Sequence, residues 1–175
     1  PKNHWMHNDV NAIIEDKTGK LWFGTRGYTT VYDGKPFTTI TNNDGKPFTN
    51  VRSIIKDKKG NIWLGGADGL WRYDGKTFTN YTQKFVGYIY EDKKGNIWTS
   101  SESAKNQNWV LSRYDEKSLL DNKPIVTEIK VDDKMLCGIL EANDGSIWFG
   151  GLKGVYRYDT HLPEGQQKTI KDFKK

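Results

Sequence analysis

The sequence has few of the residues that form cross-links, membrane spans and acid–base sites. It contains one cysteine, Cys137, which excludes a disulfide within the chain and leaves the redox state of its compartment open. No apolar run approaches the ~20 residues that a membrane helix needs, so we expect no membrane-spanning segment. The three histidines, His4, His7 and His161, lie at the edges of the repeat region described below, which argues against histidine-based catalysis inside it.

The sequence also lacks metal-ligand patterns. His4 and His7 have the spacing of half a metal site, but no cluster of Cys, Asp or Glu accompanies them, so we expect an exposed N-terminal segment. Four turns of the Asp-x-x-Gly type, one of them altered, lack the ligand series of calcium loops and are interpreted as regular turns. We therefore predict no metal, no cofactor and no catalytic residue.

The net charge of +5 does not indicate a nucleic-acid partner. The lysines gather in a C-terminal tail, residues 168–175, and at turn tips, namely Lys17, Lys58, Lys59, Lys93 and Lys94. These positions are typical of solvated surface and do not form a basic stripe interleaved with aromatic residues. We expect no nucleic acid to bind.

A repeat dominates what is present. Four times a turn of the Asp-x-x-Gly type leads into a Trp, and a Tyr-Asp pair follows further on; the four tryptophans are Trp22, Trp63, Trp98 and Trp148. Their spacings of 41, 35 and 50 residues average 42, the length of a four-stranded propeller blade. The sequence predicts an all-β protein, a β-propeller of four-stranded antiparallel blades, with residues 1–175 as one propeller region. The blades are placed at approximately 8–42, 49–83, 84–132 and 134–174.

Each unit is predicted to hold four short strands and no helix. The first strands begin at Val10, Val51, Val86 and Leu136 and are apolar on both faces, as expected of strands between neighbouring blades. The second strand carries the Trp and the third ends in Tyr-Asp. The fourth strands are predicted at residues 36–41, 77–82, 125–131 and, near the C-terminus, 168–173.

The motif resembles the two-component-regulator propeller repeat, which has an Asp-x-x-Gly turn, a Trp, glycines and a closing Arg-Tyr-Asp. The second unit matches almost throughout, whereas Ala142 replaces the Asp in the fourth, Val31 replaces the Arg in the first, and the third lacks the glycines after Trp98. The resemblance implies a periplasmic sensor region of a bacterial hybrid kinase, or an exported protein or lipoprotein made only of propeller repeats.

The resemblance therefore implies a periplasmic, cell-surface or extracellular location. The chain begins at Pro1 and shows no signal peptide, so we expect any export signal or lipid anchor to lie outside it. Four blades are few for a closed propeller, and an open arc would expose aromatic blade faces. Three states remain open: a small ring, part of a larger ring with missing blades, or a self-associating arc.

Candidate site residues are found where the repeat fails. From the Trp to the following Tyr is 10 residues in the first, second and fourth units but 16 in the third, which predicts a long loop over residues 100–109. This loop should lie on the face that holds the blade-to-blade connections, where propeller ligands commonly bind. The predicted ligand-binding residues on this face are Arg26, Tyr28, Arg52, Asp68, Glu102, Lys105, Asn106, Trp109 and Lys153. The alternative for Trp109 is that it only packs the loop onto its blade.

Three functions are consistent with these patterns. The first is a non-catalytic binding or sensing module that recognises a small molecule, a glycan or a protein on its loop-rich face. The second is a structural or assembly subunit of a cell-envelope complex that uses blade faces or edges. The third and least favoured is a carbohydrate-active enzyme, which would need two carboxylates about 5–10 Å apart in a cleft.

Overall fold

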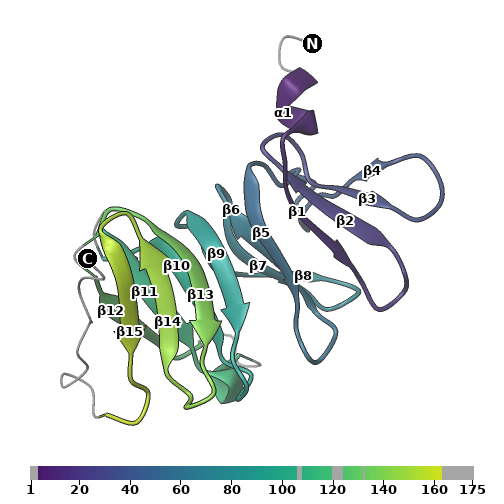
Figure 1. Cartoon of the computed structure of the whole chain (residues 1–175). Helices are drawn as coiled ribbons and strands as arrows, with labels where there is room; N and C mark the ends of the chain where they lie inside the picture. The colour runs from purple at the N-terminus through teal and green to yellow at the C-terminus, as the bar shows by residue number, and fades with distance from the viewer. Residues whose placement is uncertain (1–3, 106–107, 120–123, 132, 163–175) are drawn as a thin grey trace. The chain divides into compact units, whose positions relative to one another are not determined.

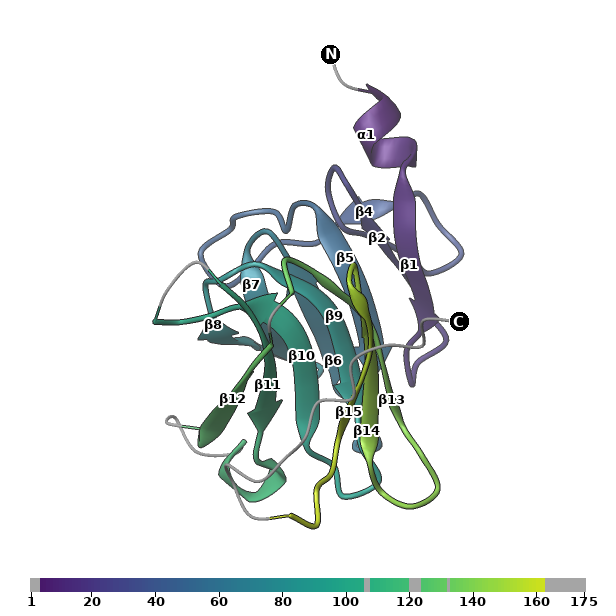
Figure 2. The same cartoon turned by 60° about the vertical axis from the view of Figure 1, so that its left-hand side comes forward.

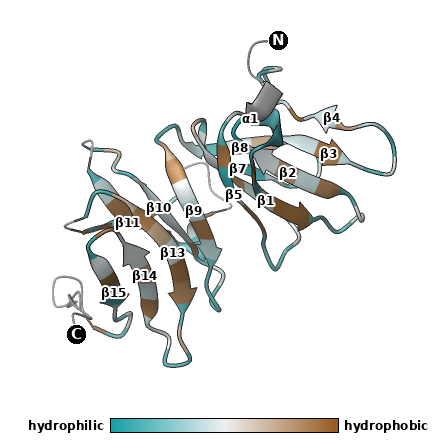
Figure 3. Cartoon of the chain, turned by 45° about the horizontal axis from the view of Figure 1, so that its top comes forward, coloured by the Kyte–Doolittle hydropathy of each residue, from teal (hydrophilic) through white to brown (hydrophobic). Residues whose placement is uncertain are grey.

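The computed structural model describes residues 4–105, 108–119, 124–131 and 133–162. The chain divides into two compact units, Pro1–Ile89 and Tyr90–Lys175. Each unit has a hydrophobic core of its own. Hydrophobic residues gather on the strands, including β1, β10 and β13, whereas the connecting loops are mostly hydrophilic (Figure 3).

Unit 1 begins with a short helix and continues as antiparallel strands (Figure 1). Helix α1 (His4–Asn8) leads into a four-stranded sheet in the order β1-β2-β3-β4, and a second sheet follows in the order β5-β6-β7-β8. The strands of the first sheet are β1 (Val10–Glu15), β2 (Leu21–Thr25), β3 (Thr30–Tyr32) and β4 (Thr38–Thr39). Those of the second are β5 (Val51–Lys56), β6 (Ile62–Gly66), β7 (Gly69–Tyr73) and β8 (Phe78–Thr82).

The remaining strands form two further antiparallel sheets (Figure 2). The third sheet has the order β12-β11-β10-β9, from β9 (Val86–Glu91), β10 (Ile97–Glu102), β11 (Trp109–Tyr114) and β12 (Val126–Lys130). A 3₁₀ turn, Glu116–Ser118, precedes β12. The fourth sheet has the order β13-β14-β15, from β13 (Leu136–Glu141), β14 (Ile147–Gly151) and β15 (Gly154–Tyr158).

The repeated turn explains why Asp, Gly and Trp recur together. The carboxylates of Asp16, Asp57 and Asp92 each accept a hydrogen bond from the indole N–H six residues later, at 2.9, 2.8 and 2.8 Å. The same aspartates accept backbone N–H groups of the turn, and the turn glycines adopt positive φ, 83° at Gly60. One carboxylate therefore closes the turn and anchors the buried Trp of the next strand.

The fold class is confirmed: the chain is all-β, with three four-stranded antiparallel sheets and a fourth of three described strands, all of the propeller type. The predicted fourth strands appear as β4, β8 and β12, while the fourth strand of the last unit, residues 168–173, lies outside the described residues. The predicted blade limits stay predictions. In the described parts of the chain, no helix is long and apolar enough to cross a membrane.

Two expectations were wrong. The chain does contain helical turns, α1 and the 3₁₀ turn, because the segments before β1 and between β11 and β12 are free of ladder pairing and close on local hydrogen bonds. The first strands are not all buried on both faces. Strand β5 is largely buried, but Val10 and Ile13 of β1 are 44% and 58% exposed.

Candidate functional site

Two of the predicted residues in unit 1 lie in the loop between β2 and β3. The Arg26 Nε forms an ion pair with Asp9 Oδ2 at 2.9 Å, which ties this loop to the segment before β1. Tyr28 is exposed, its backbone N–H donates to His7 Nδ1 at 3.3 Å, and the two rings lie 5.0 Å apart. Arg52 lies within β5, not in a loop, and donates to Asn11 Oδ1 at 3.2 Å.

The structure brings Tyr28 and Asp68 to the same end of unit 1 through Thr49. Tyr28 and Thr49 form an antiparallel bridge. The Asp68 carboxylate accepts from the Thr49 backbone N–H at 2.6 Å and from its hydroxyl at 3.0 Å. The β2–β3 loop, the connection into β5 and the β6–β7 turn therefore converge, as expected of loops on one face of neighbouring blades.

A cavity of about 340 Å³ adjoins Asp68 on this face. Trp71 provides an aromatic wall, since its indole N–H donates to the Asp68 carbonyl oxygen at 2.7 Å and its ring meets buried Phe48 edge to face at 5.4 Å. Polar side chains with both donors and acceptors complete the lining, which consists of Asn42, Asp44, Lys46, Pro47, Phe48, Ala67, Asp68, Trp71 and Gln83.

Of the predicted residues, only Asp68 lines this cavity, and Trp71 was missed. Trp71 was not predicted because candidate residues were sought where the repeat departs from its pattern, and the second unit matches that pattern almost throughout. The sequence does contain a signal for this residue: only the second unit has a Trp at this position, where the other units have Thr30, Ser112 and Tyr156. The connection over residues 42–48 could not be placed from sequence, since its approach to β7 depends on the packing of two sheets.

In unit 2 the insertion lengthens a hairpin instead of forming one long loop. Strand β10 continues through Glu102, β11 begins at Trp109, and these two residues pair. Ser100 and Ser101, expected in the loop, are buried in the strand, and the Ser100 hydroxyl donates to the Leu136 carbonyl oxygen at 2.6 Å. The predicted loop over residues 100–109 is therefore wrong in extent, because Ser100, Ser101 and Glu102 pair with residues of β11 and lengthen the ladder.

The residues that follow β10, 103–105, are held to the neighbouring strand β12. Glu128 of β12 accepts from the Ser103 hydroxyl at 3.0 Å and from the Ala104 backbone N–H at 2.8 Å. Lys105 is exposed, and its backbone N–H donates to the Ser103 hydroxyl. Glu102 and Trp109 are half-buried, and Asn106 lies outside the described residues. A ligand role for these residues stays a prediction.

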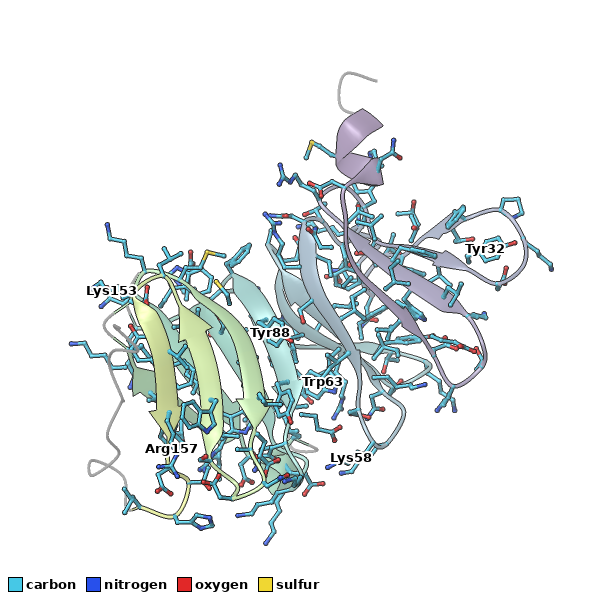
Figure 4. The ribbon with its side chains drawn as sticks, viewed as in Figure 1. Tyr32, Lys58, Trp63, Tyr88, Lys153 and Arg157 are labelled. Carbon is cyan, nitrogen blue, oxygen red and sulfur yellow. The ribbon has the colours of Figure 1, made fainter. Side chains whose placement is uncertain are left out.

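Lys153 lies at the turn between β14 and β15, and its side chain extends away from the sheet (Figure 4). Its backbone N–H donates to Asp133 Oδ2 at 2.8 Å, and the Tyr156 hydroxyl donates to the same oxygen at 2.9 Å. Burial acts to raise the pKa of Asp133, but these hydrogen bonds outweigh it and lower the pKa below its usual value.

The recurrent arginines pack on the recurrent tryptophans of their own blades. Arg72, Arg113 and Arg157 place their guanidinium carbons 5.9, 6.0 and 6.0 Å from the ring centroids of the repeat tryptophans Trp63, Trp98 and Trp148. Figure 4 labels Trp63 and Arg157, one partner from each unit. These contacts account for the recurrence of Arg in the repeat, and no ligand is needed to explain it.

Unit 2 has a second cavity, of about 460 Å³, at the end where the repeated turns lie. Its lining mixes charges of both signs and includes Lys93, Arg113, Glu116, Asp144 and His161. Hydrogen bonds from the hydroxyl and backbone N–H of Ser146, with a contribution from Arg157, lower the pKa of Asp144 to about 2. Across the described ranges, no group of three or more His, Cys, Asp or Glu side chains is placed to hold a metal ion.

Comparison with protein families gives one match. The model of a family described as "Two component regulator propeller" matches residues 4–27 and 45–68, both in unit 1. The resemblance drawn from the repeat is thereby confirmed. No curated protein sequence matches the chain.

Solved structures give several matches to propeller proteins. The extracellular domain of a putative one component system from B. thetaiotaomicron is 22% identical, with a TM-score of 0.70 over 95% of this chain and 25% of that one. The extracellular domain of a putative hybrid two component system from the same organism is 21% identical, with a TM-score of 0.67 over 93% of this chain and 23% of that one. A catalytically inactive virginiamycin B lyase from Staphylococcus aureus, with quinupristin, is 20% identical, with a TM-score of 0.64 over 93% of this chain and 55% of that one.

The present chain spans about a quarter of the length of the first two structures. At these identities the likeness establishes the fold. It does not transfer a ligand or a reaction.

Proposed function

We propose that this chain, which carries two-component regulator propeller repeats, is a non-catalytic binding module of an exported bacterial protein, with a small polar ligand such as a sugar as its target. The family match and the two extracellular domains from B. thetaiotaomicron support a sensing or binding role and a location outside the cell membrane. The lyase neighbour shares the fold at 20% identity and supports no reaction for this chain.

The cavity beside Trp71 is the observation that carries this proposal. A sugar ring presents an apolar face and a rim of hydroxyl groups, and it binds best where an aromatic wall stands beside hydrogen-bonding side chains. The Trp71 indole is held by its bond to Asp68, so little side-chain freedom is lost when a ring stacks on it. Lys46, Asp44 and Gln83 supply donors and acceptors around it.

The cavity beside Trp71 contains one of the ligand-binding residues predicted from the sequence. Asp68 belongs to both the predicted set and the cavity lining. Arg26, Tyr28 and Arg52 stay predicted contacts for a larger ligand in unit 1. The predicted contacts in unit 2 also stay predictions, to be tested separately; they are Glu102, Lys105, Asn106, Trp109 and Lys153.

The test is a binding screen with tryptophan fluorescence as the readout. The chain is titrated with a panel of mono- and oligosaccharides and small polar metabolites. For any ligand that binds, Trp71→Ala is expected to weaken the affinity at least about tenfold, or roughly 1.4 kcal/mol. Gln83→Ala, a change at an exposed side chain, is expected to weaken it less.

Trp109→Ala tests the alternative site in unit 2, and it also removes one tryptophan from the chain. An unchanged affinity for Trp71→Ala, together with a loss for Trp109→Ala, would move the site to unit 2 and refute the cavity assignment. Conversion of a bound ligand into a new product, detected by mass spectrometry, would refute the non-catalytic role.

A further inference from the structure

Neighbouring blades in this chain share a repeated contact between a glycine and two aliphatic residues. Gly24 of β2 lies against Val51 and Ile54 of β5. A Cβ on Gly24 would meet Val51 Cγ1 at 2.9 Å and Ile54 Cδ1 at 3.1 Å. The glycine thus provides a slot for these two side chains, which a Cβ at this position would crowd.

The same contact recurs twice along the chain. A Cβ on Gly65 of β6 would meet Val86 Cγ1 at 2.8 Å and Ile89 Cδ1 at 2.9 Å. In unit 2 Ser100 takes the place of the glycine, and its hydroxyl donates to the backbone of Leu136, the counterpart of Val51. The aliphatic residues of all three contacts are buried.

An aromatic pair accompanies the glycine contact. Tyr73 of the second blade packs on Trp22 of the first, with ring centroids 5.5 Å apart. Tyr158 of the last blade packs on Trp98 at the same distance. The first blade therefore presents a Trp and a slot to the second blade, which supplies a Tyr and two aliphatic side chains, and the third and fourth blades repeat the aromatic pair.

The first blade carries its half of this contact unused. Val10 and Ile13 of β1 stand at the positions of Val51 and Ile54 but are 44% and 58% exposed. Tyr32, the counterpart of Tyr73, is also exposed and is labelled in Figure 4. We call the surface formed by Val10, Ile13 and Tyr32 the Val–Ile face.

The last blade carries the opposite half, also unused. Gly150 of β14 stands at the position of Gly24 and Gly65, and a Cβ there would meet no atom of the described residues within 4 Å. Trp148 is half-buried, whereas the other three repeat tryptophans are buried. Leu140 and Val155 are 60% and 38% exposed. We call the surface formed by Leu140, Trp148, Gly150 and Val155 the Gly face.

We propose that the Val–Ile face of one copy of this chain packs against the Gly face of a second copy. The Gly face is built to receive a strand that presents two aliphatic residues and a tyrosine, and β1 of this chain presents that set on an exposed surface. The contact joins two different surfaces, so it is head-to-tail, and repetition of it gives a ring or an open array. It rests on the blade contacts alone and is independent of the ligand proposed above.

Light scattering coupled to size exclusion tests this contact. The wild-type chain is expected to show a mass that rises with concentration above the 20.1 kDa of one copy. Ile13→Asn removes an aliphatic residue from the Val–Ile face, and Gly150→Val fills the slot on the Gly face. Each variant alone is expected to remain at the mass of one copy.

A one-to-one mixture of the two variants gives the sharpest result. Ile13→Asn keeps an intact Gly face and Gly150→Val keeps an intact Val–Ile face, so the mixture should form one contact and reach about 40 kDa, twice the mass of one copy. Ile125→Asn, at a similarly exposed isoleucine outside both faces, should associate like the wild type. Circular dichroism shows whether each variant is folded.

Three results would overturn the proposal. The first is a wild-type mass of one copy at all concentrations. The second is association of either single variant as strong as that of the wild type. The third is a mixture that stays at the mass of one copy while both variants are folded.

Discussion

At the residue scale, the Asp–Trp hydrogen bond is the feature that the repeat preserves. The sequence predicted the turn from Asp and Gly, but it did not predict that the same carboxylate holds the indole of the following strand. In the fourth unit Ala142 cannot do this, and the Ser146 hydroxyl accepts from Trp148 at 3.0 Å while donating to Asp144 at 2.6 Å. The replacement could be recognised only once the turn was seen in three dimensions.

Asp57→Ala tests the importance of this bond. The change removes the acceptor of the Trp63 indole and of two backbone N–H groups, and leaves a buried donor unpaired. We expect the free energy of unfolding in urea to fall by about 1–3 kcal/mol. Asp33→Ala, at an exposed aspartate, should change it by less than about 0.5 kcal/mol; equal effects of the two substitutions would contradict the anchoring role.

At the element scale, the second strands of the blades have matching sequences but differ in how closely the neighbouring strands pack on them. Gly65 in β6 and Gly150 in β14 occupy the same position in two matching strands, and sequence alone gives them the same role. The structure distinguishes their surroundings, because β9 residues crowd Gly65 whereas none of the described residues has an atom within 4 Å of a Cβ on Gly150. The insertion in the third unit shows the same limit, since its serines joined a ladder that sequence spacing assigned to a loop.

A matched pair of glycine substitutions measures this difference. Gly65→Val places a side chain against Val86 and Ile89, and overpacking of this kind costs about 1–3 kcal/mol. Gly150→Val meets no atom of the described residues within 4 Å, and neither glycine adopts a positive φ, so the cost of this change should stay within about 0.5 kcal/mol. The measurement is chemical unfolding at low protein concentration; a larger loss for Gly150→Val would show that its surroundings are not open.

At the scale of the whole molecule, several carboxylates link stability to pH. The pKa of Asp144 is lowered to about 2 by hydrogen bonds from Ser146 and Arg157. The pKa of Asp74 is lowered by backbone N–H groups of Thr77 and Lys76. For Asp16 burial opposes the change, but hydrogen bonds from Trp22 and Thr18 prevail and lower the pKa.

Acid should therefore destabilise the protein. A group whose pKa is lower in the folded state stabilises that state above its unfolded pKa, near 3.8 for Asp, and this stabilisation is lost as the pH falls towards the folded value. We expect the thermal midpoint, followed by circular dichroism, to be steady from pH 7 to about 5 and to fall between about pH 4 and 2. Asp144→Asn should melt lower than the wild type at pH 7, with the difference closing by about pH 2; a difference that widens in acid would reverse the assigned sign.

The blade as the unit of this protein can be predicted from the chain alone, because Asp, Gly, Trp and Tyr act over a few residues to set turns, strands and the anchoring of one side chain. The same residues carry the family resemblance. Which repeat positions are covered and which are exposed depends on the three-dimensional packing: Val10 and Val51, or Gly65 and Gly150, are alike in sequence and differ in what packs on them. The cavity beside Trp71 likewise depends on a loop meeting a strand from another sheet. Packing between segments far apart in the chain sets both outcomes, and no local pattern encodes it.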